Sequence, residues 1–195
     1  MARHEVTFPI TDAREIEKLR AGDEVTVQGH VIGIRDRTQI RIFDQGMEPP
    51  MDLSGAFLLH TAPNVRKLGP GRYEKICIGT TTSARMVRFT EPLGEQFGVR
   101  AICGKGGFPD EAIEPMRRLG MVYLAIVGGA AALETTQIEE IEEVAWEELM
   151  PECLWKFRVK DFGPLWVVID SHGNSMYRDV QTEATKRLEG ILAGL

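Results

Sequence analysis

The sequence predicts a layered α/β domain with a mixed sheet. Short apolar runs alternate with amphipathic helical segments through the middle of the chain, and both ends are rich in strand-forming residues. This order of elements is typical of helices packed on a sheet. With 195 residues and no internal repeat or low-complexity segment, the chain is expected to form one domain, residues 1–195, with a sizeable core.

The first part of the chain predicts three strands and two helical segments. The strands are expected at 5–10, 24–34 and 56–60, and the second is expected to bend at Gly29. Thr11 or Asp12 is expected to cap a short helix that ends at Leu19. Asp36 is a favourable N-cap for a segment that reaches about residue 45.

The middle of the chain predicts alternating strands and helices. We expect strands at 72–79, 99–103 and 121–127. A helix at 83–97 is expected to kink near Pro92, because proline cannot donate a backbone hydrogen bond. A second helix, at 109–119, begins with proline and is followed by Gly120, the favoured arrangement at helix ends.

The last third begins with an acidic stretch. Residues 119–155 contain no lysine or arginine, and seven glutamates lie between Glu134 and Glu148. Apolar residues spaced by three, at 138, 141 and 144, predict a helix that passes into a strand. Two strands, 155–159 and 165–170, are expected around a turn at 160–164. The final helix is expected to bury one apolar stripe: Val180, Ala184, Leu188, Ile191 and Leu192.

Composition excludes several classes of protein. The net charge of −6 argues against a general nucleic-acid binder. No apolar run approaches a membrane span, and the charged N-terminus does not resemble a signal peptide, so we expect a cytoplasmic protein without membrane contact. The three cysteines, Cys77, Cys103 and Cys153, are too widely spaced for a metal site and are expected to be free thiols, the first two packed in the core.

The stretch from Gly79 to Lys105 is the predicted site of chemistry. The hydroxyl residues Thr80, Thr81, Thr82 and Ser83 precede a helix whose free N–H groups can bind an anion, and Arg85 stands in its first turn. Lys105 lies among glycines that let a ligand approach the backbone. These features predict a pocket for a small carboxylate or phosphate; the alternative is a helix cap with two surface cations.

Two familiar motifs are absent. The glycines before Lys105 are separated by five residues and Gly106 follows, whereas a P-loop requires four residues and then a serine or threonine. No Gly-x-Ser-x-Gly pattern occurs that could make a hydrolase with His60 or His172. Phosphate-loop and esterase chemistry are therefore disfavoured.

A set of short motifs occurs in a fixed order along the chain: Arg35-Asp36, Gly79 to Met86, Gly104 to Gly107, Val127 to Leu133, Met150 to Trp155, Phe162 to Pro164 and Asp170 to Ser175. As a set, they closely resemble the beta subunit of the iron–sulfur (class I) fumarate hydratases and L(+)-tartrate dehydratases. The resemblance covers nearly the whole chain.

The resemblance implies a swivelling β/β/α domain that closes over a small dicarboxylate. It implies that Arg35, Thr81, Arg85 and Lys105 contact the substrate, and Thr82 and Ser83 belong to the same loop. Thr81 and Asp36 are the candidate catalytic residues, with Thr81 next to the carbon that exchanges a proton. A four-iron, four-sulfur cluster is implied on a partner alpha subunit, and no metal is expected on this chain. We therefore expect a hetero-oligomer, or a homodimer when the chain is isolated.

Three positions depart from the family pattern. The family usually has proline where this chain has Thr80, histidine at Gln39 and glycine at Ala62. The resemblance implies reversible hydration of fumarate to malate as the first hypothesis. L(+)-tartrate dehydration, a methylated dicarboxylate substrate, and a non-catalytic anion-binding or regulatory domain of the same fold remain open.

Overall fold

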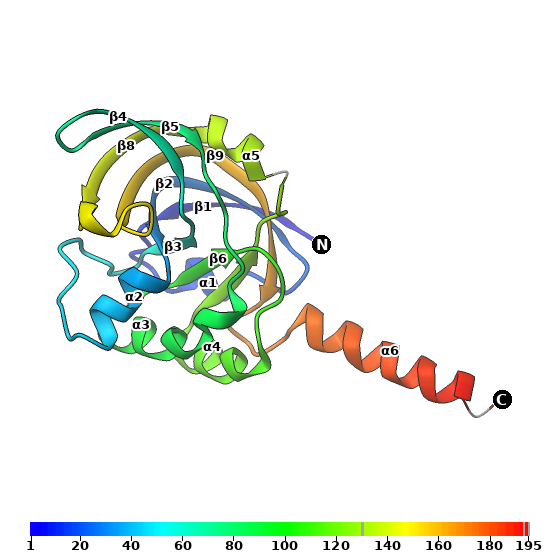
Figure 1. Cartoon of the computed structure of the whole chain (residues 1–195). Coiled ribbons are helices and arrows are strands. Elements are labelled where there is room, and N and C mark those ends of the chain that lie inside the picture. Colours follow the sequence, from blue (N-terminus) through cyan, green and yellow to red (C-terminus); the bar gives the residue numbers. More distant parts are fainter. Residues whose placement is uncertain (130, 193, 195) are drawn as a thin grey trace.

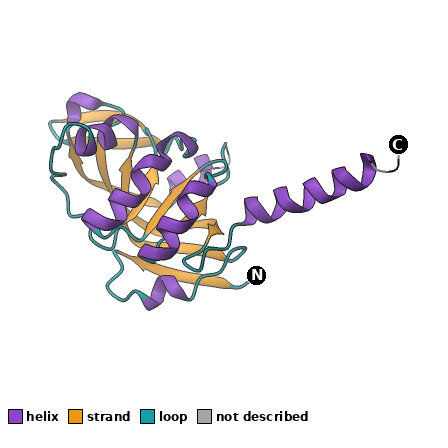
Figure 2. Ribbon diagram, turned by 90° about the horizontal axis from the view of Figure 1, so that it is seen from below, coloured by secondary structure: helices purple, strands orange, loops and turns teal. Residues whose placement is uncertain are grey.

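The computed structural model describes residues 1–129, 131–192 and 194, and in it the strands close into a barrel with helices on one side (Figures 1 and 2). The strands are β1 (Arg3–Phe8), β2 (Glu24–Ile34), β3 (Phe57–His60), β4 (Asn64–Gly69), β5 (Arg72–Cys77), β6 (Ala101–Gly104), β7 (Val122–Ala125), β8 (Ile138–Ala145) and β9 (Leu154–Ile169). The α-helices are α1 (Arg14–Glu17), α2 (Asp36–Phe43), α3 (Thr90–Phe97), α4 (Ile113–Leu119), α5 (Ala131–Glu134) and α6 (Met176–Leu192). Short 3₁₀ helices are η1 (Ala84–Phe89), η2 (Asp110–Ala112), η3 (Thr135–Gln137) and η4 (Glu147–Leu149).

The barrel closes because β9 pairs with both ends of the four-strand row β2-β3-β6-β7. The order of the main sheet is β1-β2-β3-β6-β7-β9-β8, and β2 pairs in addition with β9. The strands in the row β1-β2-β3-β6-β7 all run parallel to one another. Strand β9 runs antiparallel to its partners β2, β7 and β8. The predicted α/β class and mixed sheet are confirmed.

Side chains alternate between two cores along the central strands. Leu59 and Cys103 point into the barrel, whereas their neighbours Leu58 and Ile102 belong to the core beneath the helices. All four residues are almost completely buried. Strands buried on both faces read as continuous apolar runs, which explains why β3 and β6 could be predicted from sequence.

The segment 80–82 extends this sheet beyond the ends of β3 and β6. Thr80 forms a bridge with Thr61, and Thr82 forms a bridge with Lys105. Since β3 and β6 pair directly only through residues 57–59 and 101–103, the segment occupies the space that opens beyond them. The threonine segment is therefore held by backbone hydrogen bonds on both sides.

Several predicted elements are confirmed, and β9 requires a correction. Strand β2 has the predicted bounds and a register shift at Gly29, whose φ is 87°. The two strands predicted around 160–164 are one 16-residue strand, β9. The turn residues there form an irregularity within the strand, with Asp161 at a φ of 53°, because β2 pairs with β9 on both sides of it.

The helix predicted over residues 138–144 is also wrong, because these residues form strand β8. Its register against β9 shifts between Ile138 and Glu140 and again between Ile141 and Glu143. Each shift adds a residue, so apolar side chains three positions apart face the same side of a bulged strand. The three-residue spacing thus reflects bulges, which periodicity alone cannot distinguish from a helix.

The central region differs from its prediction in two places. Strand β4 was not predicted; it pairs with β5 as a separate two-stranded sheet around the turn at Pro70 and Gly71. The helix predicted at 83–97 is divided into the 3₁₀ helix η1 and the α-helix α3, with the change at Thr90. Pro92 then lies in the first turn of α3, where its missing N–H is tolerated.

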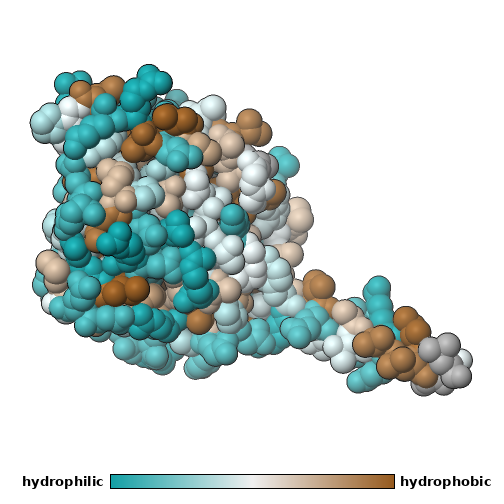
Figure 3. Space-filling model, viewed as in Figure 1, coloured by the Kyte–Doolittle hydropathy of each residue, from teal (hydrophilic) through white to brown (hydrophobic). Residues whose placement is uncertain are grey.

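Helix α6 extends away from the barrel, so the predicted burial of its apolar stripe is wrong (Figures 1 and 2). None of its described residues is buried, and Val180, Leu188 and Ile191 are 68%, 55% and 63% exposed. Figure 3 shows brown apolar side chains along this projecting helix. No helix in the described part of the chain combines the length and apolar character needed to cross a bilayer.

Candidate active site

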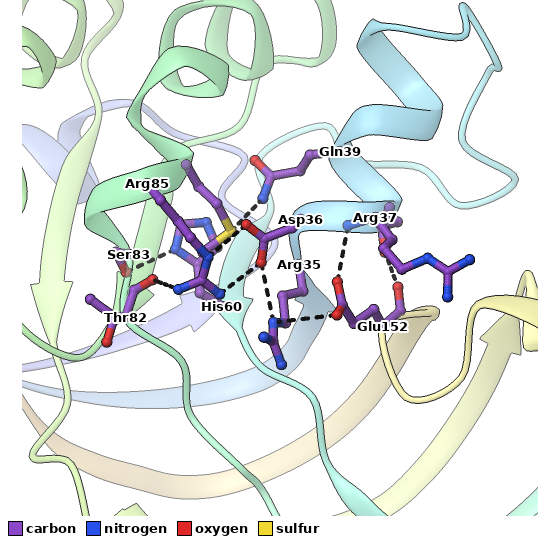
Figure 4. Close-up of polar contacts among 11 residues, drawn as sticks. Arg35, Asp36, Arg37, Gln39, His60, Thr82, Ser83, Arg85 and Glu152 are labelled. Atoms are coloured by element: carbon purple, nitrogen blue, oxygen red, sulfur yellow. Dashed lines mark hydrogen bonds and ion pairs between the residues drawn. The ribbon is translucent and has the colours of Figure 1, made fainter.

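Polar side chains gather where the parallel strands β2 and β3 end (Figure 4). Arg35 and Asp36 directly follow β2, and His60 is the last residue of β3. The carboxyl ends of parallel strands meet at one edge of a sheet, which is where binding residues of α/β folds collect. The segment 80–85 lies at this same edge, since the N–H of Thr81 donates to the carbonyl of His60 over 2.9 Å.

Arg85 is held by two neighbours. Its Nε and Nη2 each donate to a different oxygen of Asp36 over 2.7 Å, and its Nη1 donates to the carbonyl of Thr82 over 3.1 Å. The Arg85 side chain remains 45% exposed. The guanidinium is thus fixed in place while part of it stays accessible to a ligand.

Asp36 does not cap helix α2 as predicted. The N-cap residue is Arg35, and Asp36 lies in the first turn with its carboxylate directed to Arg85 and, over 3.2 Å, to Arg35 Nε. Burial raises the pKa of Asp36, but hydrogen bonds and charge from Arg85 outweigh it and hold the pKa below its ordinary value. Asp36 is therefore ionised at neutral pH and is a weaker base than an ordinary carboxylate.

Glu152, which the sequence did not identify, completes the cluster. One of its oxygens lies 3.9 Å from Arg35 Nε, and the other accepts from the backbone N–H of Arg37 over 3.1 Å. The cluster of Arg35, Asp36, Arg85 and Glu152 therefore contains two cations and two carboxylates. Glu152 lies within the motif Met150 to Trp155, but because it is more than 60 residues from Arg35 and Arg85 in the sequence, the motif does not show which residues it meets.

The backbone joins the threonine segment to the glycine loop. Lys105 N–H donates to the carbonyl of Thr81 over 3.2 Å, and Ser83 N–H donates to the carbonyl of Lys105 over 3.3 Å. The aliphatic chain of Lys105 lies against Gly128, where an added Cβ would be 3.1 Å from Lys105 Cδ. Within residues 1–129, 131–192 and 194, its ammonium makes no ion pair and no hydrogen bond with the arginine cluster.

The hydroxyl cap predicted at the start of the helix after Ser83 is absent. The helix after Ser83 is the six-residue 3₁₀ helix η1, and the Ser83 hydroxyl makes no capping hydrogen bond. Ser83 is fully buried, and its Oγ lies 2.8 Å from Nδ1 of His60. Its hydroxyl is therefore engaged inside the protein, whereas Thr82 is exposed and Thr81 is 8% exposed.

His60 lies beneath the cluster as a neutral side chain. It is 1% exposed, and burial lowers its pKa to about 3. Among the described residues, its Nε2 is buried without a hydrogen-bond partner. The other histidine considered, His172, lies elsewhere: its Nε2 is 2.8 Å from the carbonyl of Glu17, and Asp170 fixes its backbone through a 3.0 Å hydrogen bond from the His172 N–H.

We expect the Gly104→Ala substitution to disturb the site. A Cβ at Gly104 would lie 2.0 Å from Ser83 Oγ and 3.2 Å from the Thr81 carbonyl, so the buried loop must move. Overpacking of this kind costs about 1–3 kcal/mol, which corresponds to a lower Tm of roughly 2–12 °C for a chain of this size. Gly69→Ala is the control, because nothing lies within 4 Å of its Cβ position. Equal Tm values for the two variants would contradict the packing described here.

No metal centre is evident on the described residues. They contain no group of three His, Cys, Asp or Glu side chains able to hold an ion. Cys103 and Cys153 are buried and Cys77 is half-buried, so core packing is confirmed for Cys103. Burial raises the pKa of the Cys103 thiol and raises that of Cys153 to about 12, and thiols that stay protonated are poor metal ligands. The residues present do not fit an iron–sulfur cluster.

The barrel and its arginine cluster define a class of protein: an α/β domain that gathers cations and hydroxyl groups at the carboxyl ends of its strands. Comparison with known proteins identifies the family. The family model described as "Fumarase C-terminus" matches residues 3–180, and the chain belongs to this family, as a beta subunit of the class I fumarate hydratase and L(+)-tartrate dehydratase type.

The descriptions of similar proteins agree with this assignment. The L(+)-tartrate dehydratase subunit beta of Escherichia coli (strain K12) is 38% identical over 188 residues, which cover 96% of this chain and 92% of the relative. The subunit of the same description from Shigella boydii serotype 4 is equally similar, with the same coverage. A Geobacillus stearothermophilus protein, described as "Putative fumarate hydratase class I", is 35% identical over 181 residues, which cover 92% of this chain but 34% of that protein.

Proposed function

We propose that this chain is the beta subunit of a two-subunit iron–sulfur hydro-lyase that interconverts fumarate and malate in the cytoplasm. The chain belongs to a family of lyase subunits. We infer the specific substrate and the partner from the site, and the cellular location from the sequence. The geometry around Arg85 supports this proposal most strongly.

Arg85 retains donors that suit a carboxylate. A guanidinium has five N–H groups. Asp36 takes two of them and the Thr82 carbonyl takes one, which leaves two of the five for a ligand. A carboxylate can accept two parallel hydrogen bonds from such a group. Asp36 can therefore stay in place and hold Arg85 while a substrate carboxylate binds.

Two more cationic side chains can bind the second carboxylate group of a dicarboxylate. Arg35 is 27% exposed beside Asp36, and the backbone of Lys105 pairs with Thr82 in the threonine segment. We infer that Arg35 and Lys105 bind the second carboxylate and that Thr81, between the two groups, relays the proton at the neighbouring carbon. An unassisted hydroxyl is a poor base, so Thr81 needs a stronger group to pass the proton to.

The loss of water requires chemistry that this chain does not provide. Departure of hydroxide is made easy by a metal that coordinates its oxygen. Because the residues described here do not fit a cluster, we assign the four-iron, four-sulfur cluster to an alpha subunit. The exposure of Arg85 and Arg35 supports a second surface that excludes water from the site. In the Geobacillus relative, the matching domain makes up 34% of one longer chain. We infer that the two parts of such an enzyme can also be joined in one polypeptide.

L(+)-tartrate is the second candidate substrate. The E. coli and Shigella relatives are described as L(+)-tartrate dehydratase subunits, and each covers almost all of this chain. Tartrate is also a dicarboxylate, so the same arginines can bind it. It differs from malate by a second hydroxyl group, which the residues described above do not select for or against.

Purification with the partner subunit and assay against four acids tests the proposal. We expect a brown, oxygen-sensitive complex that converts fumarate and malate faster than L(+)-tartrate or a methylated dicarboxylate. A preference for tartrate would establish the second candidate. A colourless chain that binds dicarboxylates but has no partner and no turnover would instead indicate a non-catalytic anion-binding domain.

A further inference from the structure

Helix α6 turns its polar side toward the short helix η2 and its apolar side toward solvent. A surface groove of about 390 Å³ lies between the two helices and is lined by Asp110 of η2 and by polar residues of α6: Arg178, Thr182, Lys186 and Glu189. The apolar side chains Val180, Leu188 and Ile191 are each more than half exposed. Folding of one chain favours the reverse orientation, because burial of apolar surface stabilises a fold. An apolar side left exposed in this way is typical of an interaction surface.

Five positions on the exposed side of α6 form a row whose spacing is symmetric. The row consists of Tyr177, Val180, Ala184, Leu188 and Ile191, and its intervals are three, four, four and three residues. Because successive residues of an α-helix are about 100° apart, the five positions fall within about 80° of the helix circumference. The row reads the same in both directions from Ala184, so it can match a second α6 that runs the opposite way.

The charges beside this row favour an antiparallel neighbour. Glu183 and Arg187 border the row on one side, and within one helix they form an ion pair over 2.9 Å while remaining 55% and 75% exposed. Among the described residues of α6, the opposite border carries the uncharged Gln181 and Thr185. In an antiparallel pair the same borders meet, so Glu183 of each copy lies beside Arg187 of the other. A parallel pair would set the charged border against the uncharged one, and charges that flank an apolar seam determine helix orientation.

We propose that α6 pairs in antiparallel orientation with α6 of a second copy of this chain, with the two-fold axis at Ala184. The interface is isologous, since each copy contributes the same row of residues. Because α6 extends away from the barrel, the two barrels lie at opposite ends of the helix pair (Figures 1 and 2).

The pairing brings the second copy close to the glycine loop. Ile191 of each copy lies beside Tyr177 of the other. The Tyr177 ring is 3.9 Å from the position of a Cβ built on Gly107, in the loop that carries Lys105. The end of one helix therefore lies near the glycine loop of the other copy. The pairing itself does not depend on the proposed hydro-lyase function.

Sedimentation of the full chain in the analytical ultracentrifuge tests whether the pair forms. We expect a monomer–dimer equilibrium, with dimer present by about 200 µM, in the range of weak interfaces. Leu188→Glu should raise the dimer Kd at least about tenfold, because it places two like charges in the apolar seam. Thr182→Glu adds the same charge on the opposite side of the helix and should change Kd less than about twofold. Both positions are exposed, so the circular dichroism spectrum should not change.

A wild-type chain that stays monomeric to about 200 µM would overturn the proposal. If Leu188→Glu then weakened binding of a cluster-bearing subunit, or of vesicles of phosphatidylglycerol and phosphatidylcholine, α6 would belong to that interface instead.

Charge exchange and cross-linking test the orientation. Arg187→Glu should raise the dimer Kd at least about fivefold, because like charges then meet, and the double variant Glu183→Arg/Arg187→Glu should restore Kd to within about twofold. Under mild oxidation Ala184→Cys should form a disulfide between copies, whereas Val180→Cys should not, since antiparallel helices place the two 180 positions about 12 Å apart. The wild-type chain, with its half-buried Cys77, is the blank. Efficient cross-linking of Val180→Cys, or an unchanged Kd for Arg187→Glu, would overturn the antiparallel pairing.

Discussion

Arg85→Ala should reduce kcat/KM of the assembled enzyme by about 10²–10⁴-fold. The substitution removes the two N–H donors left for a substrate carboxylate, and each charge-assisted hydrogen bond contributes about 1.5–3 kcal/mol. Arg85→Lys should lose nearly as much, because an ammonium cannot hold Asp36 and a carboxylate with the same planar geometry. Steady-state kinetics with fumarate and malate measure the effect.

Arg88 provides a matched control for this experiment. It lies on the same 3₁₀ helix η1 and forms an equivalent two-pronged pair, with Asp44, over 2.9 and 2.7 Å. Arg88→Ala removes the same charge from the same helix but leaves the cluster intact, so kcat/KM should stay within about twofold. If Arg85→Ala and Arg88→Ala had the same kinetics, the site would have to be placed elsewhere.

Thr81→Val should lower kcat by about 10²–10⁴-fold, the usual contribution of a positioned proton-transfer group. Valine has the shape of threonine, and the backbone bonds from Thr81 to His60 and Lys105 do not involve its side chain. The fold should therefore persist, with an unchanged circular dichroism spectrum. Thr81→Ser retains the hydroxyl and should recover kcat to within about tenfold of the wild type.

A substitution at the neighbouring Thr80 tests whether the loss of kcat is specific to the Thr81 hydroxyl. Thr80 pairs with Thr61 through its backbone and belongs to neither the proposed catalytic nor the proposed binding residues. Thr80→Val should leave kcat within about threefold. A full rate in Thr81→Val would exclude a proton-relay role for that hydroxyl.

Sequence reasoning succeeded where local signals agree with tertiary structure. The apolar runs of β3, β6 and β7 predicted these central strands, because they are buried largely on both faces, and the alternation of residues 24–34 predicted β2. The motifs also identified the residues that now stand near one another at the ends of β2 and β3. Arg35, Asp36 and Arg85 form one cluster in the structure.

The failures arose where partners are distant in the sequence. Aspartate is a residue type that often caps helices, so Asp36 was predicted to be a cap. Only its contact with Arg85, 49 residues later in the sequence, shows where its carboxylate is directed. Bulges in β8 imitate helical spacing because β9 imposes the register. The apolar stripe of α6 suggested burial, yet no residue of the described chain covers it. Pattern alone cannot tell which surface, if any, an amphipathic helix meets.

The insertion of residues 80–82 between the ends of β3 and β6 limits how the site can open. A flap at an active site usually moves on hinges and forms few fixed contacts. Here the Thr81 amide, the Thr81 carbonyl and the Ser83 amide are all engaged with the neighbouring strands. The threonine segment is therefore part of the sheet and not an independent flap, and it can move only together with the neighbouring strands.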